Sequence, residues 1–394
     1  MWSKKIQSFL VICACVALLA ACSDTDIAAQ RAARAAKAQG DIVVGVTWPF
    51  STAKGRLWEG VAMAQEEINA GGGVLGRKLV LVKEDDQLSV TKGTMIAHKF
   101  AENLDMVAVI GTLNSYIAIP TAPVYEFAGM VMLTQGSSVV RLTNQGYKKV
   151  FRMIPSNRYV GEMLADYAKS KKYKHVLVYY VKNEYGLDLA NAFEQRATTI
   201  GVEVTDRVSY LAGAGDYKLA MQYWKDFYNF DAIFLAGSLP EGAQIIRAAR
   251  EIGIKVPIFA GDGLDSPNLM QLGGDAVEGV EVTSFFHPNT PTPAVGAFND
   301  KFVKRYKKLP DTSAALGYDA VTLLAHAMTQ AKTTVPADVA AELHKLKGWS
   351  GVTGEHGFDG AGNVMDKPIV MQVVKNGQFE FSTIGRLSTP RVTP

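Results

Sequence analysis

Two short polar segments, each placed directly after an apolar run, carry the hydroxyl groups with the clearest binding chemistry in this sequence. Gly111-Thr112-Leu113-Asn114-Ser115 follows Val107 to Ile110, and Thr134-Gln135-Gly136-Ser137-Ser138 follows Val131 to Leu133. Hydroxyls and free backbone amides at the start of a helix can bind a carboxylate. For either segment alone, simple N-capping of a helix by serine explains the residues equally well. The two adjacent segments together favour a binding site.

A second pair of segments offers an acidic group. Lys182-Asn183-Glu184-Tyr185-Gly186 follows Val176 to Val181, and Gly261-Asp262-Gly263 follows Ile258 to Ala260. Ligands of open α/β sheets bind at the carboxyl ends of the strands, so an acid flanked by glycines at such a point can face a cleft. Asp262 could pair there with an ammonium group. The alternative is an aspartate that only forms a turn.

The sequence contains no motif that supports nucleotide binding, metal binding or catalysis. Gly71, Gly73 and Gly76 match G-x-G-x-x-G, but they follow a helical pattern and precede a strand, the reverse of the order that dinucleotide binding requires. No G-x-S-x-G segment occurs, so a serine hydrolase would lack its usual signature. We therefore expect no cofactor, no metal and no enzymatic activity. The histidines form no pair at helical ligand spacing; they are His98, His175, His287, His326, His344 and His356.

The N-terminal residues indicate export and lipid anchoring. Lys4 and Lys5 precede an apolar run from Phe9 to Leu19, which ends in Leu19-Ala20-Ala21-Cys22. A basic start, a short apolar run and small residues before a cysteine are typical of a bacterial lipoprotein signal. The run is shorter than the roughly 20 residues that a membrane-spanning helix needs. We expect residues 1–21 to be removed and Cys22 to carry the lipid.

The mature chain is then expected to hold no free thiol, because Cys13 and Cys15 leave with the signal. Residues 22–40, with no large apolar face, are predicted to form a tether, in part helical, that holds the domain off the membrane. The whole chain has 41 basic and 38 acidic residues, so the charge is close to balanced. This balance gives no electrostatic case for nucleic acid as a partner.

Two series of alternating elements predict the fold class. From Asp41, short β-branched runs alternate with amphipathic stretches, and a second such series begins after a break near Ser156. Continuous apolar runs such as Val107 to Ile110 are typical of parallel strands covered by helices on both faces. We predict an α/β protein with two doubly wound, Rossmann-like lobes.

The end of the chain follows a different pattern. After Phe286 the sequence predicts three helices that return to cover the first sheet, and Asn376-Gly377 predicts a hairpin. These late segments divide between the two lobes. The expected organisation is a signal peptide over 1–21, a tether over 22–40, lobe I over 41–156 plus about 286–365, and lobe II over 157–285 plus about 366–394.

These features resemble the type I periplasmic binding proteins, and among them the leucine/isoleucine/valine-binding family of ABC transporter substrate-binding lipoproteins. The resemblance extends from Asp41 to about Phe381. It rests on these segments: Gly60 to Gly76, Glu84-Asp85-Asp86, Gly146-Tyr147 to Phe151-Arg152, Tyr185-Gly186, Gly274 to Gly279 and Phe358 to Gly362.

The resemblance implies two lobes joined by a three-crossover hinge and an extracytoplasmic protein of the periplasm or cell surface. It implies capture of an amino acid, or a molecule of similar shape, that is passed to an ABC permease in the inner membrane. A ligand-sensing receptor component of a signalling system is the alternative, and an enzyme on the same framework is a more distant one.

In the family, a serine and a neighbouring hydroxyl loop bind the carboxylate of an amino acid, and an acid in the second lobe binds its ammonium group. The resemblance gives the serine role to Ser115 and the ammonium role to Asp262, where aliphatic amino-acid binders have glutamate. Tyr185 corresponds to the cleft tyrosine. The hydroxyl loop corresponds to Gly136, Ser137 and Ser138.

The pocket for the ligand side chain departs from the family pattern. Trp48 and Phe50 stand where small residues are usual, and Ser238-Leu239 stands where aliphatic binders tend to have tyrosines. Trp48 and Phe50 could stack on an aromatic or cationic ligand, or they could only pack their own loop. We therefore expect an aromatic or polar amino acid rather than leucine, with an amide or a small aromatic acid as further candidates.

Overall fold

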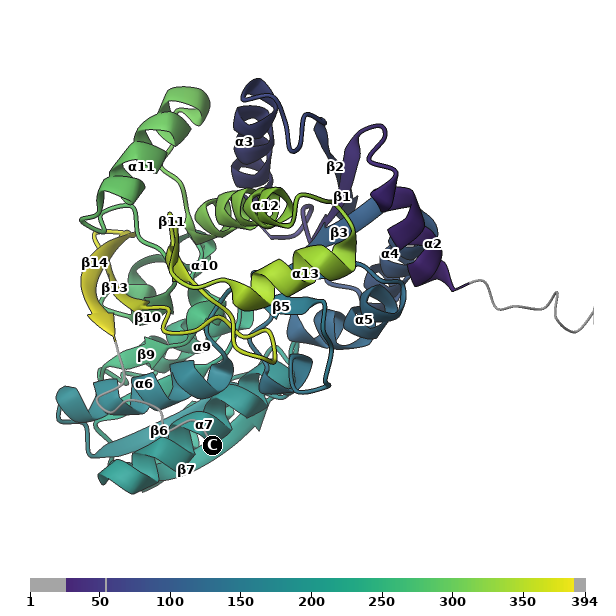
Figure 1. Cartoon of the computed structure of the whole chain (residues 1–394). Helices are drawn as coiled ribbons and strands as arrows, with labels where there is room; N and C mark the ends of the chain where they lie inside the picture. Colours follow the sequence, from purple (N-terminus) through teal and green to yellow (C-terminus); the bar gives the residue numbers. More distant parts are fainter. Residues whose placement is uncertain (1–25, 54, 386–394) are drawn as a thin grey trace, which may run out of the picture.

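The computed structural model describes residues 26–53 and 55–385, so the predicted signal peptide and the predicted lipidation site at Cys22 lie outside the described residues. Figure 1 shows two lobes, one above the other, each built around its own sheet with helices packed on it. The α/β class and the two doubly wound lobes predicted from the sequence are confirmed.

The sheet of lobe I is parallel and has the strand order β2-β1-β3-β4-β5. Its β3 strand is buried at every position, as expected where helices cover both faces of a sheet. One face packs against α4 (Val90–Glu102) and α5 (Ser115–Phe127). The strands are β1 (Ile42–Trp48), β2 (Leu79–Asp85), β3 (Met106–Ile110), β4 (Val131–Thr134) and β5 (Val150–Arg152).

The opposite face of this sheet is covered by segments distant in sequence. Helix α3 (Leu57–Ala70) packs there with α12 (Thr312–Ala331) and α13 (Pro336–Lys345). The chain approaches itself closely between α3 and α12, because a Cβ at Gly60 would lie 2.0 Å from the carbonyl oxygen of Ala314. The late helices therefore return to lobe I, as the sequence predicted.

The sheet of lobe II has the order β14-β13-β10-β9-β8-β6-β7. Helices α6 (Asn157–Ser170) and α7 (Glu184–Ile200) pack on one face. Helices α8 (Lys218–Phe227), α9 (Glu241–Glu251) and α10 (Asn268–Gly273) pack on the other. The parallel strands are β6 (His175–Val181), β7 (Glu203–Tyr210), β8 (Ala232–Ala236), β9 (Ile258–Ala260) and β10 (Glu281–Ser284).

An antiparallel hairpin completes lobe II. Strands β13 (Ile369–Lys375) and β14 (Gln378–Gly385) pair beside β10. Asn376 and Gly377 both have positive φ, 52° and 71°, as the tight turn of a two-residue hairpin requires. The hairpin predicted from Asn-Gly is confirmed.

The chain passes between the lobes three times. The crossovers run from β5 to α6, from β10 to α11 (Pro293–Tyr306), and from β12 (Gly354–His356) to β13. Helix α11 belongs to lobe I, where its apolar face packs with residues of α3 and α12. β12 pairs with β11 (Trp349–Gly351) in a small hairpin beside α12.

Residues 27–36, which the sequence analysis assigned to the tether, form helix α2 (Ile27–Ala36) on the surface of lobe I. Arg31 is fully buried there. Its guanidinium donates to the carbonyl oxygens of Met106, at 2.8 Å, and of Ala128 and Ala101. The helix docks through this buried cation together with a few apolar contacts, from Ala35 and Ile27. So small an apolar face is why the composition of this segment indicated a tether.

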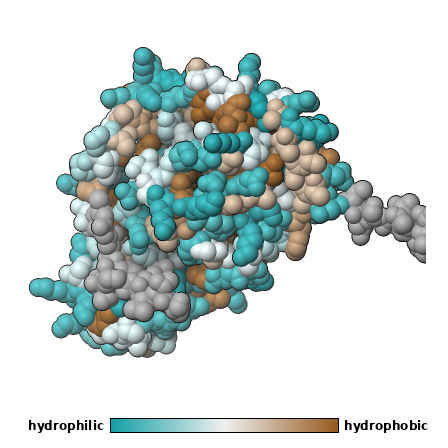
Figure 2. Space-filling view, viewed as in Figure 1, coloured by the Kyte–Doolittle hydropathy of each residue, from teal (hydrophilic) through white to brown (hydrophobic). Residues whose placement is uncertain are grey.

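The molecular face in Figure 2 is mostly hydrophilic, with small groups of hydrophobic residues between polar ones. Within residues 26–53 and 55–385, no helix combines the length and the apolar character needed to cross a bilayer.

Candidate functional site

The two hydroxyl segments of lobe I are in contact in the structure. Ser115 is the first residue of α5, directly after the β3 loop, and Ser137 Oγ donates a hydrogen bond to Ser115 Oγ at 3.2 Å. Thr134 Oγ1 accepts from the backbone N–H of Ser137 at 3.2 Å and donates to the carbonyl oxygen of Thr112 at 3.2 Å. These bonds hold two hydroxyls beside the N-terminus of a helix, where backbone amides attract an anion.

Gly136 allows the two loops to approach each other. A Cβ at this position would lie 2.5 Å from the Cα of Leu113 and 2.7 Å from the carbonyl oxygen of Thr112. Both neighbours are backbone atoms that cannot give way easily. The structure therefore gives Gly136 a packing role that places the hydroxyl loop against the β3 loop.

Ser138 is buried, and its Oγ has no hydrogen-bond partner in the described part of the chain. Buried polar atoms are nearly always paired, so this hydroxyl is a candidate contact for a ligand. The carbonyl oxygen of Ser138 accepts from the backbone N–H of Asn157 at 2.7 Å.

In lobe II, Tyr185 and Asp262 form one unit. Tyr185 Oη donates to Asp262 Oδ1 at 3.2 Å and accepts from the backbone N–H of Gly263 at 2.9 Å. A Cβ at Gly261 would lie 2.7 Å from Tyr185 Oη, and one at Gly263 would lie 2.3 Å from the carbonyl oxygen of Gly237. The glycines on both sides of Asp262 therefore make room for the tyrosine that holds it.

Burial controls the ionisation of this pair. It raises the pKa of Asp262 to about 6, and the nearby charge of Asp265 adds to the effect. Burial, followed by the charge of Asp262, also raises the pKa of Tyr185 well above its usual range. The phenol is therefore a hydrogen-bond donor at neutral pH. A desolvated carboxylate of this kind gains from an ammonium partner.

Asn157, which the sequence analysis did not identify, connects the two halves of the site. It is fully buried at the start of α6, immediately after the first crossover. In addition to its bond with Ser138, its Nδ2 donates to the carbonyl oxygen of Tyr185 at 3.3 Å. The sequence signalled only a break near Ser156. That break indicated the boundary between the lobes, but it did not indicate a residue that contacts both of them.

Other contacts bring the two lobes face to face. The backbone N–H of Val140, in the short helix η1 (Val140–Leu142), donates to Asp188 Oδ2 of α7 at 2.9 Å. Burial, followed by the charges of Asp86 and Glu241, raises the pKa of Tyr116. Tyr116 lies in α5 of lobe I and Glu241 begins α9 of lobe II, so the charge of a residue in one lobe affects the pKa of a phenol in the other.

The two aromatic residues of the first loop differ in their surroundings. Trp48 is 2% exposed and belongs to the core between the sheet and helices α3 and α12. Phe50 packs edge-on against Trp58, and Lys83 Nζ lies 4.3 Å from the Phe50 ring centroid. Phe50 thus already has a cation over its ring, which favours the interpretation that it packs its own loop.

Comparison with known protein families decides what kind of molecule this is. A family profile described as periplasmic binding protein matches residues 41–378. The chain belongs to the periplasmic binding protein family. Membership gives this binding protein a solute-binding role and an extracytoplasmic location.

Relatives cover nearly the whole of this periplasmic binding protein. A Leu/Ile/Val-binding protein homolog 2 of Brucella abortus is 28% identical over 346 residues, which are 86% of this chain and 91% of the relative. A substrate-binding protein of an ABC transporter from Desulfitobacterium hafniense, solved in complex with Leu, is 40% identical with a TM-score of 0.79; the match covers 87% of this chain and all of the other. A leucine-binding protein from Thermotoga maritima is 31% identical with a TM-score of 0.82, and the match covers 88% and 99%.

Asp265, in the loop after β9 of this binding protein, is a second residue that the sequence did not identify. Asp265 accepts hydrogen bonds from Thr312 Oγ1 and Gln372 Nε2, both at 2.7 Å. It therefore joins the loop after β9 in lobe II to the start of α12 in lobe I and to β13. Burial raises the pKa of Asp265 to about 6. No local pattern distinguished it, because both partners are distant in sequence.

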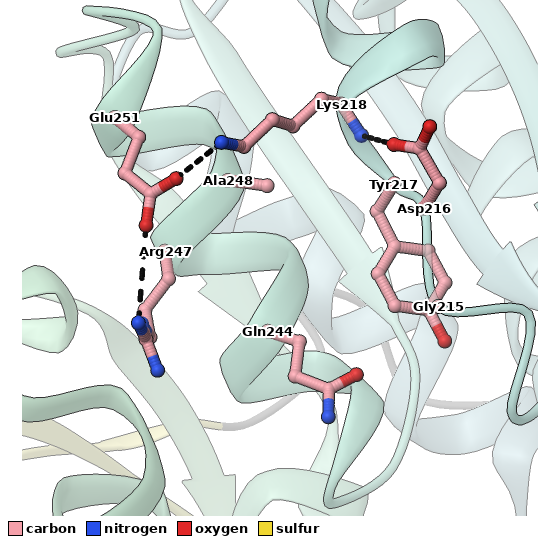
Figure 3. Close-up of a pocket in the computed structure, with 8 residues that line it drawn as sticks. All are labelled: Gly215, Asp216, Tyr217, Lys218, Gln244, Arg247, Ala248 and Glu251. Atoms are coloured by element: carbon pink, nitrogen blue, oxygen red, sulfur yellow. Dashed lines mark hydrogen bonds and ion pairs between the residues drawn. The ribbon is translucent and has the colours of Figure 1, made fainter.

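A hollow of about 320 Å³ on lobe II of the binding protein lies away from these residues, between α8 and α9 (Figure 3). Two cations line it, Lys218 and Arg247, and both reach Glu251, at 2.6 and 3.9 Å. Asp216 also lines the hollow, so its two cations are balanced by two carboxylates and it offers little net charge for an ionic ligand. In the residues that the structure describes, no group of three or more potential ligand side chains could hold a metal ion.

Proposed function

We propose that this chain is the solute-binding component of an ABC importer and that it captures an amino acid, or a molecule with the same head group, between its lobes. The observation that carries the proposal is the pairing of opposite chemistries in the two lobes. Ser115 and Ser137 lie beside a helix N-terminus in lobe I, and Tyr185 holds Asp262 in lobe II. A carboxylate suits the first group and an ammonium suits the second.

The proposed cycle is one of binding and closure. Contacts to both lobes exist together only when the lobes approach each other, so a ligand that uses both stabilises the closed form through its greater affinity for that form. The Leu/Ile/Val-binding relatives and the Leu complex of the Desulfitobacterium protein support an amino-acid ligand. A permease in the inner membrane would then receive the ligand chemically unchanged.

We propose that the site binds and does not catalyse. Ser137 Oγ donates its hydrogen bond to Ser115 Oγ. A serine nucleophile would instead donate this bond to a general base. The acid of lobe II is engaged with a tyrosine hydroxyl and suits charge pairing. Recovery of the bound molecule unaltered after long incubation with the purified protein would support binding alone; turnover would contradict it.

Titration calorimetry with each of the common amino acids tests the proposal. At least one is expected to bind with a stoichiometry of one. Asp262→Asn should then weaken binding by about 2 to 5 kcal/mol, because a buried ammonium loses its charge partner. Asp300→Asn, at an exposed position on α11, is the matched control and should bind as the wild type does. Failure of every amino acid to bind the folded protein would overturn the proposal.

The transport role and the lipid anchor need separate tests. Loss of the gene should reduce uptake of the bound amino acid by the source bacterium; normal uptake together with loss of a ligand-induced response would instead favour a sensor. Cys22→Ser should abolish incorporation of labelled fatty acid and release the protein from the membrane fraction. Unchanged labelling would rule out Cys22 as the anchor.

A further inference from the structure

Two buried polar side chains lie near the proposed head-group site, which consists of Ser115 and Ser137 in lobe I and Tyr185 and Asp262 in lobe II. Both side chains have unsatisfied hydrogen-bonding groups. Trp48 and Gln135 are each 2% exposed. The indole Nε1 of Trp48 and both amide atoms of Gln135, Oε1 and Nε2, make no hydrogen bond within the described part of the chain. Burying such groups without partners is unfavourable, and native proteins rarely leave them so.

Strand register places these two residues at the same edge of the lobe I sheet, on either side of β3. Val46 pairs with Ile110, and Ile110 pairs with Leu133. Trp48 and Gln135 each lie two residues beyond this row, toward the carboxyl ends of β1 and β4. Because strand side chains alternate with a period of two, Trp48, the last residue of β1, continues the face of Val46. Gln135 directly follows the last residue of β4, in the loop that carries Ser137.

The β3 loop connects this edge to the hydroxyls of Ser115 and Ser137. Leu113 packs against the same core cluster as Trp48, and its Cα would lie 2.5 Å from a Cβ on Gly136, the residue after Gln135. Leu113 is also two residues before Ser115. The unpaired groups of Trp48 and Gln135 therefore flank the loop that leads into the head-group site.

The chemistry of these groups defines a complementary ligand side chain. The indole offers one donor, and the amide of Gln135 offers donors and an acceptor. Neither residue is charged. A carboxamide carries a carbonyl oxygen for the donors and an NH₂ group for Gln135 Oε1, whereas an aliphatic side chain of the same shape would leave these atoms unpaired. Sites built to hydrogen-bond a ligand discriminate strongly against analogues that lack the polar group.

We propose that Trp48 and Gln135 are specificity-determining residues, and that they select an amino acid with a carboxamide side chain over its apolar isostere. This inference rests on the proposed amino-acid site and names the ligand class for it. It also makes Trp48 a hydrogen-bond donor to the ligand rather than a stacking surface.

Two isosteric pairs test the inference by calorimetry: asparagine against leucine, and glutamine against methionine. In the wild type, the amide member of at least one pair is expected to bind at least tenfold more tightly than its apolar partner. Gln135→Met, which keeps the length of the side chain and removes its polar atoms, should reduce that ratio at least tenfold. Trp48→Phe, which keeps an aromatic ring and removes the donor, should reduce it as well.

A control and a second measurement separate selectivity from folding. Gln145→Met, at an exposed position between β4 and β5, should leave the ratio unchanged. Ligand-free Gln135→Met should melt at the wild-type temperature or above, because an unpaired buried amide is removed. A purely structural role for Gln135 would weaken both members of a pair alike and leave their ratio intact, which would contradict the inference.

The two proposals fail in different ways. If leucine or methionine binds the wild type as tightly as its amide isostere, the specificity inference is overturned while the amino-acid site stands. If none of the four amino acids and no other amino acid binds, both are overturned. An amide preference that survives Gln135→Met and Trp48→Phe would also exclude these residues as its source.

Discussion

Asp262 is the residue on which the charge balance of the proposed site depends. It is a carboxylate held by Tyr185 Oη at 3.2 Å, and burial raises its pKa to about 6. In the ligand-free protein this acid therefore changes its charge just below neutral pH. An ammonium group that binds beside it would stabilise the ionised form and lower its pKa again.

Ligand affinity is accordingly expected to depend on pH. Between pH 7 and 8 Asp262 is ionised and affinity should stay constant. Below about pH 6 the ligand must displace a proton, so affinity should fall toward tenfold for each further pH unit. Calorimetry at several pH values checks this, and Asp262→Asn should bind weakly and almost independently of pH.

Asp265 provides the control for this assignment, because its pKa is also raised to about 6. Asp265→Asn removes that second acid and leaves Asp262 in place. The fall in affinity should persist in this variant, with its midpoint moved slightly down in pH because a nearby negative charge is gone. If the fall in affinity disappeared in Asp265→Asn and persisted in Asp262→Asn, the titrating group would be Asp265, and the assignment to Asp262 would be wrong.

At the scale of single elements, α2 is held to lobe I by a cation that satisfies the ends of other elements. Arg31 binds the carbonyl oxygens of Ala101 and Asn103, at the end of α4, and of Ala128, at the end of α5. Carbonyl groups at helix ends have no partner within their own helix. The guanidinium therefore caps two helices at once.

Arg31→Met should lower the free energy of unfolding by about 3 kcal/mol, since several buried carbonyl groups lose a charged donor. Urea denaturation measures the change. Arg34→Met is the matched control on the same helix: Arg34 is exposed and pairs with Asp105 at the surface, so its loss should have a much smaller effect. Equal effects of the two variants would contradict the capping role.

The third crossover contains a buried lysine. Lys367, just before β13, donates to Thr353 Oγ1 at 2.7 Å and contacts His356 Nε2 at 2.8 Å. Asp319 of α12 accepts from the backbone N–H groups of Val352 and Thr353. Burial lowers the pKa of Lys367 to about 7, although the charge of Asp319 opposes the shift.

Stability should consequently rise with pH above 7. In the unfolded chain a lysine keeps its proton up to about pH 10, whereas folded Lys367 loses it near pH 7. Unfolding thus takes up a proton between these values, and the unfolded state loses that advantage as the pH rises. Lys367→Met should flatten the rise between pH 7 and 9 in thermal melts. Lys375→Met, an exposed lysine paired with Glu380, should leave the slope of the wild type unchanged.

For the whole molecule, the proposed site is divided between two lobes that the chain joins three times. A ligand that needs Ser115 from lobe I and Asp262 from lobe II can reach both only when the lobes are close. Few covalent connections and separate cores allow the lobes to move as rigid bodies about the crossovers. Ligand binding should therefore change the shape of the protein.

Small-angle X-ray scattering should record a smaller radius of gyration for the wild type with saturating ligand than without it. Asp262→Ala lacks the lobe II charge, so its ligand should bind weakly through lobe I and produce less compaction. Compaction of the variant equal to that of the wild type, at full occupancy, would show that closure does not depend on this contact.

The sequence by itself determined the architecture and the position of the polar loops. Alternation of apolar runs and amphipathic stretches is a local property, and a buried parallel sheet requires it. Because the carboxyl ends of parallel strands lie at one edge of a sheet, the segments after β3 and β4 could be expected to meet there, and Ser115 and Ser137 do. The hairpin at Asn376-Gly377 could likewise be predicted, because its turn requires positive φ at two residues and Asn and Gly adopt such angles readily.

Only the tertiary structure decided which polar groups are buried and with which partners. Arg31 lies in a segment whose composition indicated a tether, yet its partners are 70 or more residues away. Asn157 joins Ser138 to Tyr185, and Asp265 joins α12 to β13 through Thr312 and Gln372, with no local pattern to mark either residue. Gly136, which the resemblance places in the hydroxyl loop, is also a point of close loop packing, and no local pattern showed this. Burial and hydrogen bonding of this kind depend on distances between remote segments, which the order of residues along the chain does not contain.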